Sequence, residues 1–209
     1  MKENINIKDT HKRELEEILN QKDIIKSINE NIEDLVKIIP EIKNMIGFEH
    51  NHPHHHLDVW EHTLEVLKNL NTNDIELIMA ALFHDIGKPF SYQDEEVRHF
   101  HGHPAVSLKM AKEILTRLGY DEEVIKRVSY LVETHDTIIN PNQLDNDYEM
   151  IEKRLQLQYA DAASHHRDKI QKRINILDNI KKELELKKSI KTGKKEDSYE
   201  TSINTKRKI

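Results

Sequence analysis

The sequence predicts an all-α protein built as a helical bundle, and three observations lead to this prediction. The chain of 209 residues contains only five glycines and five prolines, which favours long helices over short strands. Apolar residues recur at spacings of three and four, the period of one face of an α-helix. No segment shows the strict alternation typical of a half-buried strand. The length suits one domain with a tail.

The first predicted helix covers residues 9–39 and ends at Pro40, which cannot donate a backbone hydrogen bond. Residues 47–57 follow as a loop of unusual composition, with five histidines and a proline. Asp58, followed three residues later by a glutamate, gives a capping-box pattern. It predicts the start of a second helix that runs to about Leu70.

The third helix is predicted to begin at Asn73 or Asp74 and to run through an apolar stretch into His84. Residues 87–102 then form a polar loop. A fourth helix begins at His103, where the next residue is a proline at the favoured first position. It ends before a glycine that suits a helix stop.

Acidic residues at 121–123 open the fifth helix at its positive end, and this helix ends near His135. Residues 136–148 form a loop rich in Asn, Asp and Pro. A last long helix is predicted from about 148 to 186. The lysine-rich segment 181–209 is predicted to be a frayed helix end followed by disorder.

Composition limits the classes of function. Hydrophobic residues make up 36% and charged residues 33%, which indicates a heavily charged surface. The chain has no cysteine, so it excludes thiolate metal sites and fits the reducing cytoplasm, where we expect the protein. No apolar run approaches the roughly 20 residues of a membrane span, and no signal peptide begins the chain. The net charge of −6 argues against a surface that coats nucleic acid.

The run His84-Asp85-Ile86-Gly87-Lys88 is the most informative part of the chain. Histidine and aspartate are seldom buried together without a partner, yet this pair follows an apolar stretch. A divalent metal suits both, because imidazole nitrogen and carboxylate oxygen are its usual ligands. Two adjacent antiparallel helices would bring His62 close to the pair, and small neighbours would let the helix of Asp161 approach. This set suits Mn²⁺, Mg²⁺, Fe²⁺, Co²⁺ or Ni²⁺.

A second ion is also predicted. His103 at a helix start and His135 at a helix end could hold it, with Asp85 bridging the two ions through its two oxygens. His101 could replace His103. Alternatively His103 only caps its helix, and His135 only occupies a helix end that favours an imidazolium.

These residues resemble the HD-domain metal-dependent phosphohydrolases, whose pattern is His, then His-Asp, then a later Asp. The longer agreement is closest to the HD domain of bacterial tRNA nucleotidyltransferases, the CCA-adding enzymes, and spans about residues 50–165. It covers His55, Asp58 to Leu64, Ala80 to Pro89, Phe100 to His103 and Ala160 to Ala162. The resemblance implies an HD-domain helical bundle.

The resemblance also implies the domain organisation. We expect an N-terminal helical extension over 1–45, the HD domain over 46–180 and the basic tail over 181–209. The first segment is too short for a nucleotidyltransferase domain and lacks a paired-Asp strand motif, so synthesis of tRNA ends is not expected. A stand-alone HD phosphohydrolase is expected instead.

The activity implied is hydrolysis of a phosphoester, such as a 2′,3′-cyclic nucleotide, a nucleoside monophosphate or a nucleotide-like molecule. A metal would activate water for attack on phosphorus, which places Asp85 among the catalytic residues. Lys88 is predicted to put a cation on the phosphate. His55, with His101 as a second candidate, would contact substrate or protonate the leaving group.

Two alternatives stay open, a non-catalytic module that binds a nucleotide or an RNA end, and oxidative chemistry at a two-iron site. The oligomeric state is also open, and the N-terminal helices would suit a lid or a dimer surface. His165 and His166 are predicted to lie on the surface, and Trp60 and Phe83 in the core.

Overall fold

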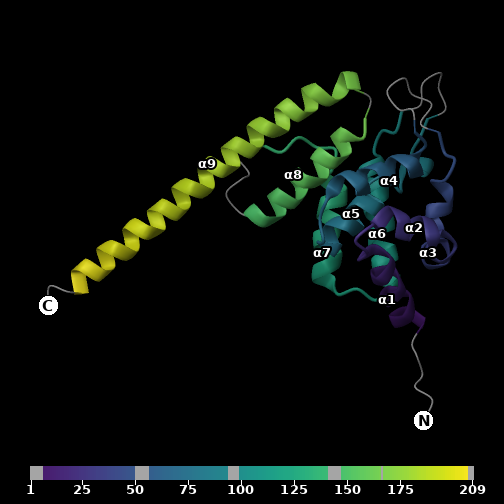
Figure 1. The fold of residues 1–209 in the computed structure, drawn as a ribbon, viewed down its shortest axis with the longest axis horizontal. Helices are drawn as coiled ribbons and strands as arrows, with labels where there is room; N and C mark the ends of the chain where they lie inside the picture. Colours follow the sequence, from purple (N-terminus) through teal and green to yellow (C-terminus); the bar gives the residue numbers. More distant parts are fainter. Residues whose placement is uncertain (1–6, 50–56, 94–98, 141–146, 166, 207–209) are drawn as a thin grey trace, which may run out of the picture.

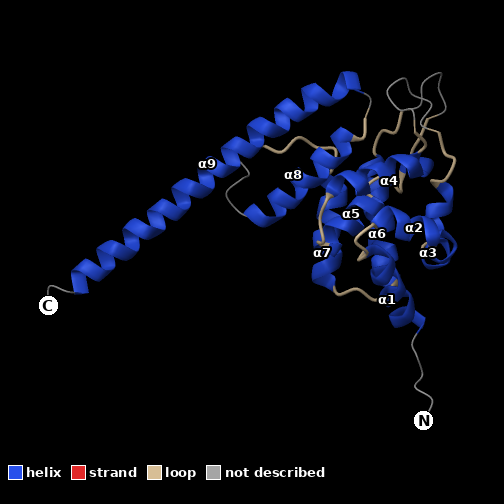
Figure 2. Ribbon diagram, viewed as in Figure 1, coloured by secondary structure: helices blue, strands red, loops and turns tan. Residues whose placement is uncertain are grey.

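The structure is a computed structural model that describes residues 7–49, 57–93, 99–140, 147–165 and 167–206, with the last range described as backbone except at 170–190. The described residues form helices and isolated β-bridges, so the prediction of an all-α fold is confirmed (Figures 1 and 2). The elements are α1 (Ile7–Leu19), α2 (Ile24–Glu30), α3 (Ile32–Ile38), η1 (Pro40–Asn44), α4 (Val59–Leu70), α5 (Ile75–Phe83), η2 (Lys88–Phe90), α6 (His103–Arg117), α7 (Glu122–Thr134), α8 (Tyr148–Ala163) and α9 (Arg167–Lys206).

The segment 9–39 forms three helices, so the prediction of one continuous helix is wrong. Asp23 begins α2 by accepting a hydrogen bond from the backbone N–H of Lys26 at 3.0 Å. Asn31, with φ −117° and ψ 21°, separates α2 from α3. The apolar spacing nevertheless continues across both turns, because the three helices bury their apolar faces in the same core.

Two aspartates begin the helices that lead to the metal-ligand candidates, as predicted. Asp58 and Glu61 form a capping box at the start of α4, with reciprocal hydrogen bonds of 2.7 and 3.0 Å. Asp74 accepts hydrogen bonds from the first backbone N–H groups of α5. Asn71, in the left-handed conformation with φ 41°, ends α4 and turns the chain towards α5.

Helix α5 lies at the centre of the bundle. Every side chain from 77 to 83 is buried, and α5 contacts α4, α6, α7 and α8. Trp60 and Phe83 belong to this core, as predicted. Because α5 is enclosed, the His84-Asp85 pair at its C-terminal end lies inside the molecule.

The region after Tyr148 contains two helices, so the prediction of one long helix is wrong. Helix α8 ends at Ser164, whose hydroxyl donates to the carbonyl of Ala160 at 2.8 Å. Helix α9 then packs along α8 through a second apolar cluster and continues past it, away from the other helices (Figure 1). The backbone remains helical to Lys206, and the division at 181 into a separate tail stays a prediction. None of the described helices has the length and apolar character needed to cross a membrane.

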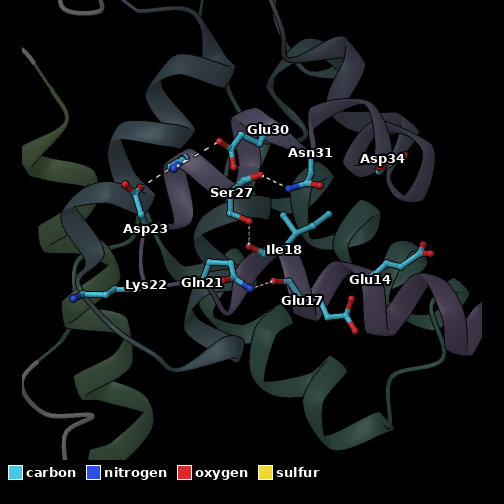
Figure 3. Close-up of a pocket in the computed structure, with 11 residues that line it drawn as sticks. Glu14, Glu17, Ile18, Gln21, Lys22, Asp23, Ser27, Glu30, Asn31 and Asp34 are labelled. Atoms are coloured by element: carbon cyan, nitrogen blue, oxygen red, sulfur yellow. Dashed lines mark hydrogen bonds and ion pairs between the residues drawn. The ribbon is translucent and has the colours of Figure 1, made fainter.

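A surface hollow of about 610 Å³ lies among α1, α2 and α3 (Figure 3). The Ser27 hydroxyl donates to the carbonyl of Ile18 at 2.8 Å and joins α2 to α1 in its floor. The charged side chains that line this hollow are mainly acidic. They are Glu14, Glu17, Asp23, Glu30 and Asp34, with Lys22 and Lys26. This lining contains none of the predicted site residues.

Candidate metal centre

Four predicted ligands from α4, the end of α5 and α8 meet in the interior. His62 Nε2 lies 3.1 Å from Asp161 Oδ1 and 3.4 Å from His84 Nε2. His84 Nε2 lies 3.1 Å from Asp85 Oδ2. His62, His84 and Asp85 are almost completely buried, so their polar atoms face one another rather than solvent.

The second predicted pair lies on the other side of Asp85. His103 Nε2 and His135 Nε2 are 3.1 Å apart, and Asp85 Oδ1 lies 3.2 Å from the first and 3.8 Å from the second. The two oxygens of Asp85 therefore face two separate groups of imidazoles. Each group has the spacing that a metal ion requires of its ligand atoms.

Backbone carbonyls determine which nitrogen of each ring carries hydrogen. His84 Nδ1 lies 2.7 Å from the carbonyl of Ala81, and His135 Nδ1 lies 2.6 Å from that of Val132. His103 Nδ1 lies 2.9 Å from the carbonyl of Phe100. Since a carbonyl only accepts, each Nδ1 donates, and in a neutral ring Nε2 then presents a lone pair.

This arrangement fits a cation. Burial lowers the pKa of His135 to about 3, so this ring is neutral at pH 7. The Nε2 lone pair of His135 then faces His103 Nε2 at 3.1 Å, and a cation bound between the two nitrogens would be stabilised by both rings. Burial also opposes protonation of His84, but the Asp85 carboxylate outweighs it and raises the His84 pKa. An ion bound there would displace that proton.

Lys88 is buried and its Nζ lies 2.7 Å from Asp85 Oδ2. Burial of Asp85 favours its neutral form, but His84 and Lys88 outweigh burial and hold the Asp85 pKa well below its usual range. The same Lys88 Nζ lies 5.6 Å from the centre of the Phe100 ring. The ammonium thus borders the cluster, and its predicted contact with a phosphate stays a prediction.

The remaining predicted residues lie elsewhere. His101 is exposed and stacks on His99, with ring centres 5.4 Å apart and planes at 12°. The structure therefore brings His103 into the cluster and leaves His101 outside it. His55 lies outside the described residues, as does His166.

His165 was predicted to lie on the surface, and this prediction is wrong. Its side chain is only 24% exposed, and its ring centre lies 5.3 Å from that of His62. Its Nδ1 donates to the carbonyl of Asp161 at 2.8 Å. The spacing of four residues from Asp161 is the signal that could have placed His165 beside the cluster.

Sequence reasoning also missed a clamp made by two side chains of α8. Arg154 donates to the carbonyls of Thr134 and Thr137 at 3.1 and 2.6 Å. Gln158 Nε2 donates to the same two carbonyls, also at 3.1 and 2.6 Å. The clamp fixes the backbone on both sides of His135.

Gly87 leaves no space for a side chain. Its N–H donates to the Ser107 hydroxyl at 2.9 Å, and a Cβ would lie 2.5 Å from the Ser107 nitrogen. We expect Gly87→Ala to lower the free energy of unfolding by about 1–3 kcal/mol, since backbone must shift. It should also lower bound metal, because Asp85 is two residues away. Urea unfolding and metal analysis would measure both effects, with Gly47→Ala as the control for backbone strain alone, because its φ of +73° penalises a side chain although no neighbour lies within 4 Å. Unchanged metal content in Gly87→Ala would contradict the expectation.

The stability of the metal-free protein should fall in acid. The His135 pKa is about 3 in the folded protein against 6.5 ordinarily, so between these values the unfolded chain binds a proton that the folded chain does not. Stability is therefore lost as pH falls from about 6.5 towards 3, by up to about 1.4 kcal/mol per unit. The raised pKa of His84 acts in the opposite direction. Urea unfolding at pH 7 and 5 would show a smaller pH effect in His135→Asn than in the wild type. An equal pH effect in both proteins would contradict this assignment.

Comparisons with known proteins agree with the motifs. Residues 54–189 match the HD domain family. An A-adding tRNA nucleotidyltransferase from Deinococcus radiodurans and a CC-adding tRNA nucleotidyltransferase from Thermus thermophilus are each 38% identical over 104 residues, 46% of this chain and 24% of the relative. A multifunctional CCA protein from Shewanella denitrificans is 31% identical over 112 residues, 51% of this chain and 26% of the relative. The chain thus spans about a quarter of the length of these relatives.

Proposed function

Because the chain belongs to the HD domain family, we propose that it is a metal-dependent phosphohydrolase. Its substrate would be a phosphoester of a nucleotide or nucleotide-like molecule, and its reaction that of a 2′,3′-cyclic phosphodiesterase, phosphatase or nucleotidase. The observation that carries the proposal is the geometry of His103 and His135, whose Nε2 atoms lie 3.1 Å apart beside the buried carboxylate of Asp85. Imidazole nitrogens and a carboxylate oxygen are the usual ligands of a divalent cation.

The ligand atoms divide into two groups around Asp85. His62, His84 and Asp161 would hold one ion together with Asp85 Oδ2. His103 and His135 would hold a second with Asp85 Oδ1. Nitrogen and oxygen donors without sulfur suit Mn²⁺, Mg²⁺, Fe²⁺, Co²⁺ or Ni²⁺.

A bound divalent ion would supply Lewis acidity towards a phosphoryl oxygen and lower the pKa of water. The side chains prepare the site for this chemistry. The carbonyls of Ala81, Phe100 and Val132 orient three imidazoles before any ion arrives. Lys88 brings a cation to the border of the cluster, where it would take charge from a phosphate.

The test is phosphate release or ring opening by metal-stripped protein reloaded in turn with each of the five ions. Substrates would be 2′,3′-cyclic nucleotides, nucleoside monophosphates and an aryl phosphate. We expect turnover that requires the metal. Absence of turnover on the whole panel, with the metal shown to be bound, would refute the hydrolase.

A non-catalytic module that binds a nucleotide or RNA end is the second candidate. It is favoured by relatives named as tRNA nucleotidyltransferases, in which the matching region is about a quarter of the protein. Nucleotide binding by the metal-loaded protein without turnover would support this module.

A further inference from the structure

A second surface hollow, of about 510 Å³, lies between α7 and α8. The connection between the two helices also contributes to it through Ile139. Its apolar wall consists of Ile139, Met150 and Ile151, which are almost completely buried. Arg154 lines the same hollow, so an apolar wall and a guanidinium share one space.

The charge of Arg154 has no acidic partner among the described residues. The residue is only 5% exposed, and its guanidinium donates to the carbonyls of Thr134 and Thr137. Its other interactions are with the Tyr130 hydroxyl and with the Arg173 cation, which opposes its charge. None of these groups carries a negative charge, whereas a buried cation ordinarily has an opposite charge beside it. Burial lowers the Arg154 pKa, as a desolvated and uncompensated cation requires.

The other charged groups of the lining do not supply the missing negative charge. Asp147 accepts the hydrogen bond from the backbone N–H of Met150 at 3.1 Å and so caps α8. Glu123 lies 3.9 Å from Arg127, and Arg127 donates hydrogen bonds to both carboxylate oxygens of Glu76. Lys126 and Arg127 also line the hollow, and of these two cations Lys126 is exposed.

We propose that this hollow binds a small amphipathic monoanion, whose acidic head group pairs with Arg154 and whose apolar body covers Ile139, Met150 and Ile151. The lining of the hollow contains none of the candidate metal ligands, and the proposal does not depend on hydrolase activity. The head group supplies the absent counter-charge, and the volume exceeds what a single ion needs. An apolar body explains why the wall beside the cation is not polar.

The test uses octanoate, the neutral octanamide of the same chain length, and octyl phosphate as an alternative head group. Met150 is one of five methionines, so ¹³C-methyl labelling of methionine makes it a local probe of the hollow. A Met150→Leu variant assigns its signal. We expect octanoate to shift the Met150 methyl resonance and to bind about tenfold more tightly than octanamide, the effect of one charge-assisted hydrogen bond. Comparing the affinity of octyl phosphate with that of octanoate would identify the preferred head group.

Substitutions of the cationic side chains test which of them recognises the acidic head group. Arg154→Gln should abolish the preference for octanoate over octanamide, and Lys126→Gln should weaken it about twofold, as expected for an exposed charge. Lys112→Gln on α6 is the matched control, since this lysine is exposed and absent from the lining. Circular dichroism would verify folding, and if Arg154→Gln does not fold, the wild-type comparison of octanoate with octanamide decides. Equal affinity for the two molecules, no binding of either, or a shift confined to other methionines would overturn the proposal.

Discussion

Replacing Asp85 by asparagine is expected to lower metal-dependent phosphoester hydrolysis by at least roughly 10²–10³-fold. Asp85 is the residue shared by both groups of imidazoles, with Oδ1 facing one and Oδ2 the other. An amide has the same shape but carries no charge and presents only one good ligand atom. Measurement of kcat/KM after loading with Mn²⁺, together with the metal content of the purified variant, would test this expectation.

The control must separate loss of the site from loss of the fold. Asp85→Asn removes the carboxylate that pairs with the buried Lys88 ammonium at 2.7 Å, and breaking a buried ion pair can cost about 3–5 kcal/mol. His103→Gln therefore serves as a second variant, because it preserves the Asp85–Lys88 pair. Asp34→Asn is the matched control, since Asp34 is exposed and pairs with Lys37 on the same helix. An Asp85→Asn protein that retained metal and full activity would refute the metal centre.

Removing the metal is expected to lower the melting temperature by about 10 °C. An ion present at a thousand times its dissociation constant stabilises the folded state by about 4 kcal/mol, and in a chain of this size each kcal/mol corresponds to about 2–4 °C. The facing Nε2 atoms of His103 and His135 would lose the ion proposed to lie between them. Calorimetry of chelator-stripped and reloaded protein measures the difference.

Two histidine variants sharpen this measurement and decide between the alternative ligands. His101→Asn should retain the full metal-dependent shift, because His101 is exposed and stacked on His99. His103→Asn should reduce it, because His103 faces both His135 and Asp85. The reverse result would make His101 the ligand. No shift in the wild type, with ions demonstrably bound, would contradict the stabilising role.

Much of the fold could be predicted from short-range sequence patterns. Asp58 and Asp74 begin their helices as predicted, because a capping carboxylate acts on backbone groups within three residues. Membership of the HD domain family, predicted from the spaced motifs, is confirmed. The candidate ligands converge, since a buried helix ending in His84-Asp85 must place both polar side chains in the interior. Their role as ligands remains a prediction.

The errors concern features that local patterns do not encode. The segment 9–39 keeps one apolar period across two turns, so periodicity could not reveal the breaks. Helix α8 ends at Ala163, with Ser164 as its C-cap, and no glycine or proline marks this end in the sequence. The clamp of Arg154 and Gln158 joins carbonyls about twenty residues away, and such contacts depend on how α7 and α8 pack.

The candidate ligands come from distant parts of the chain, and this has a consequence for the order of folding. His62 and Asp161 are 99 residues apart in sequence and meet only when α4 and α8 have packed. Since no short fragment contains either complete group, an ion has little to bind in the early folding ensemble. Metal should therefore leave the refolding rate nearly unchanged and slow unfolding, so that it prolongs the lifetime of the native state without nucleating it.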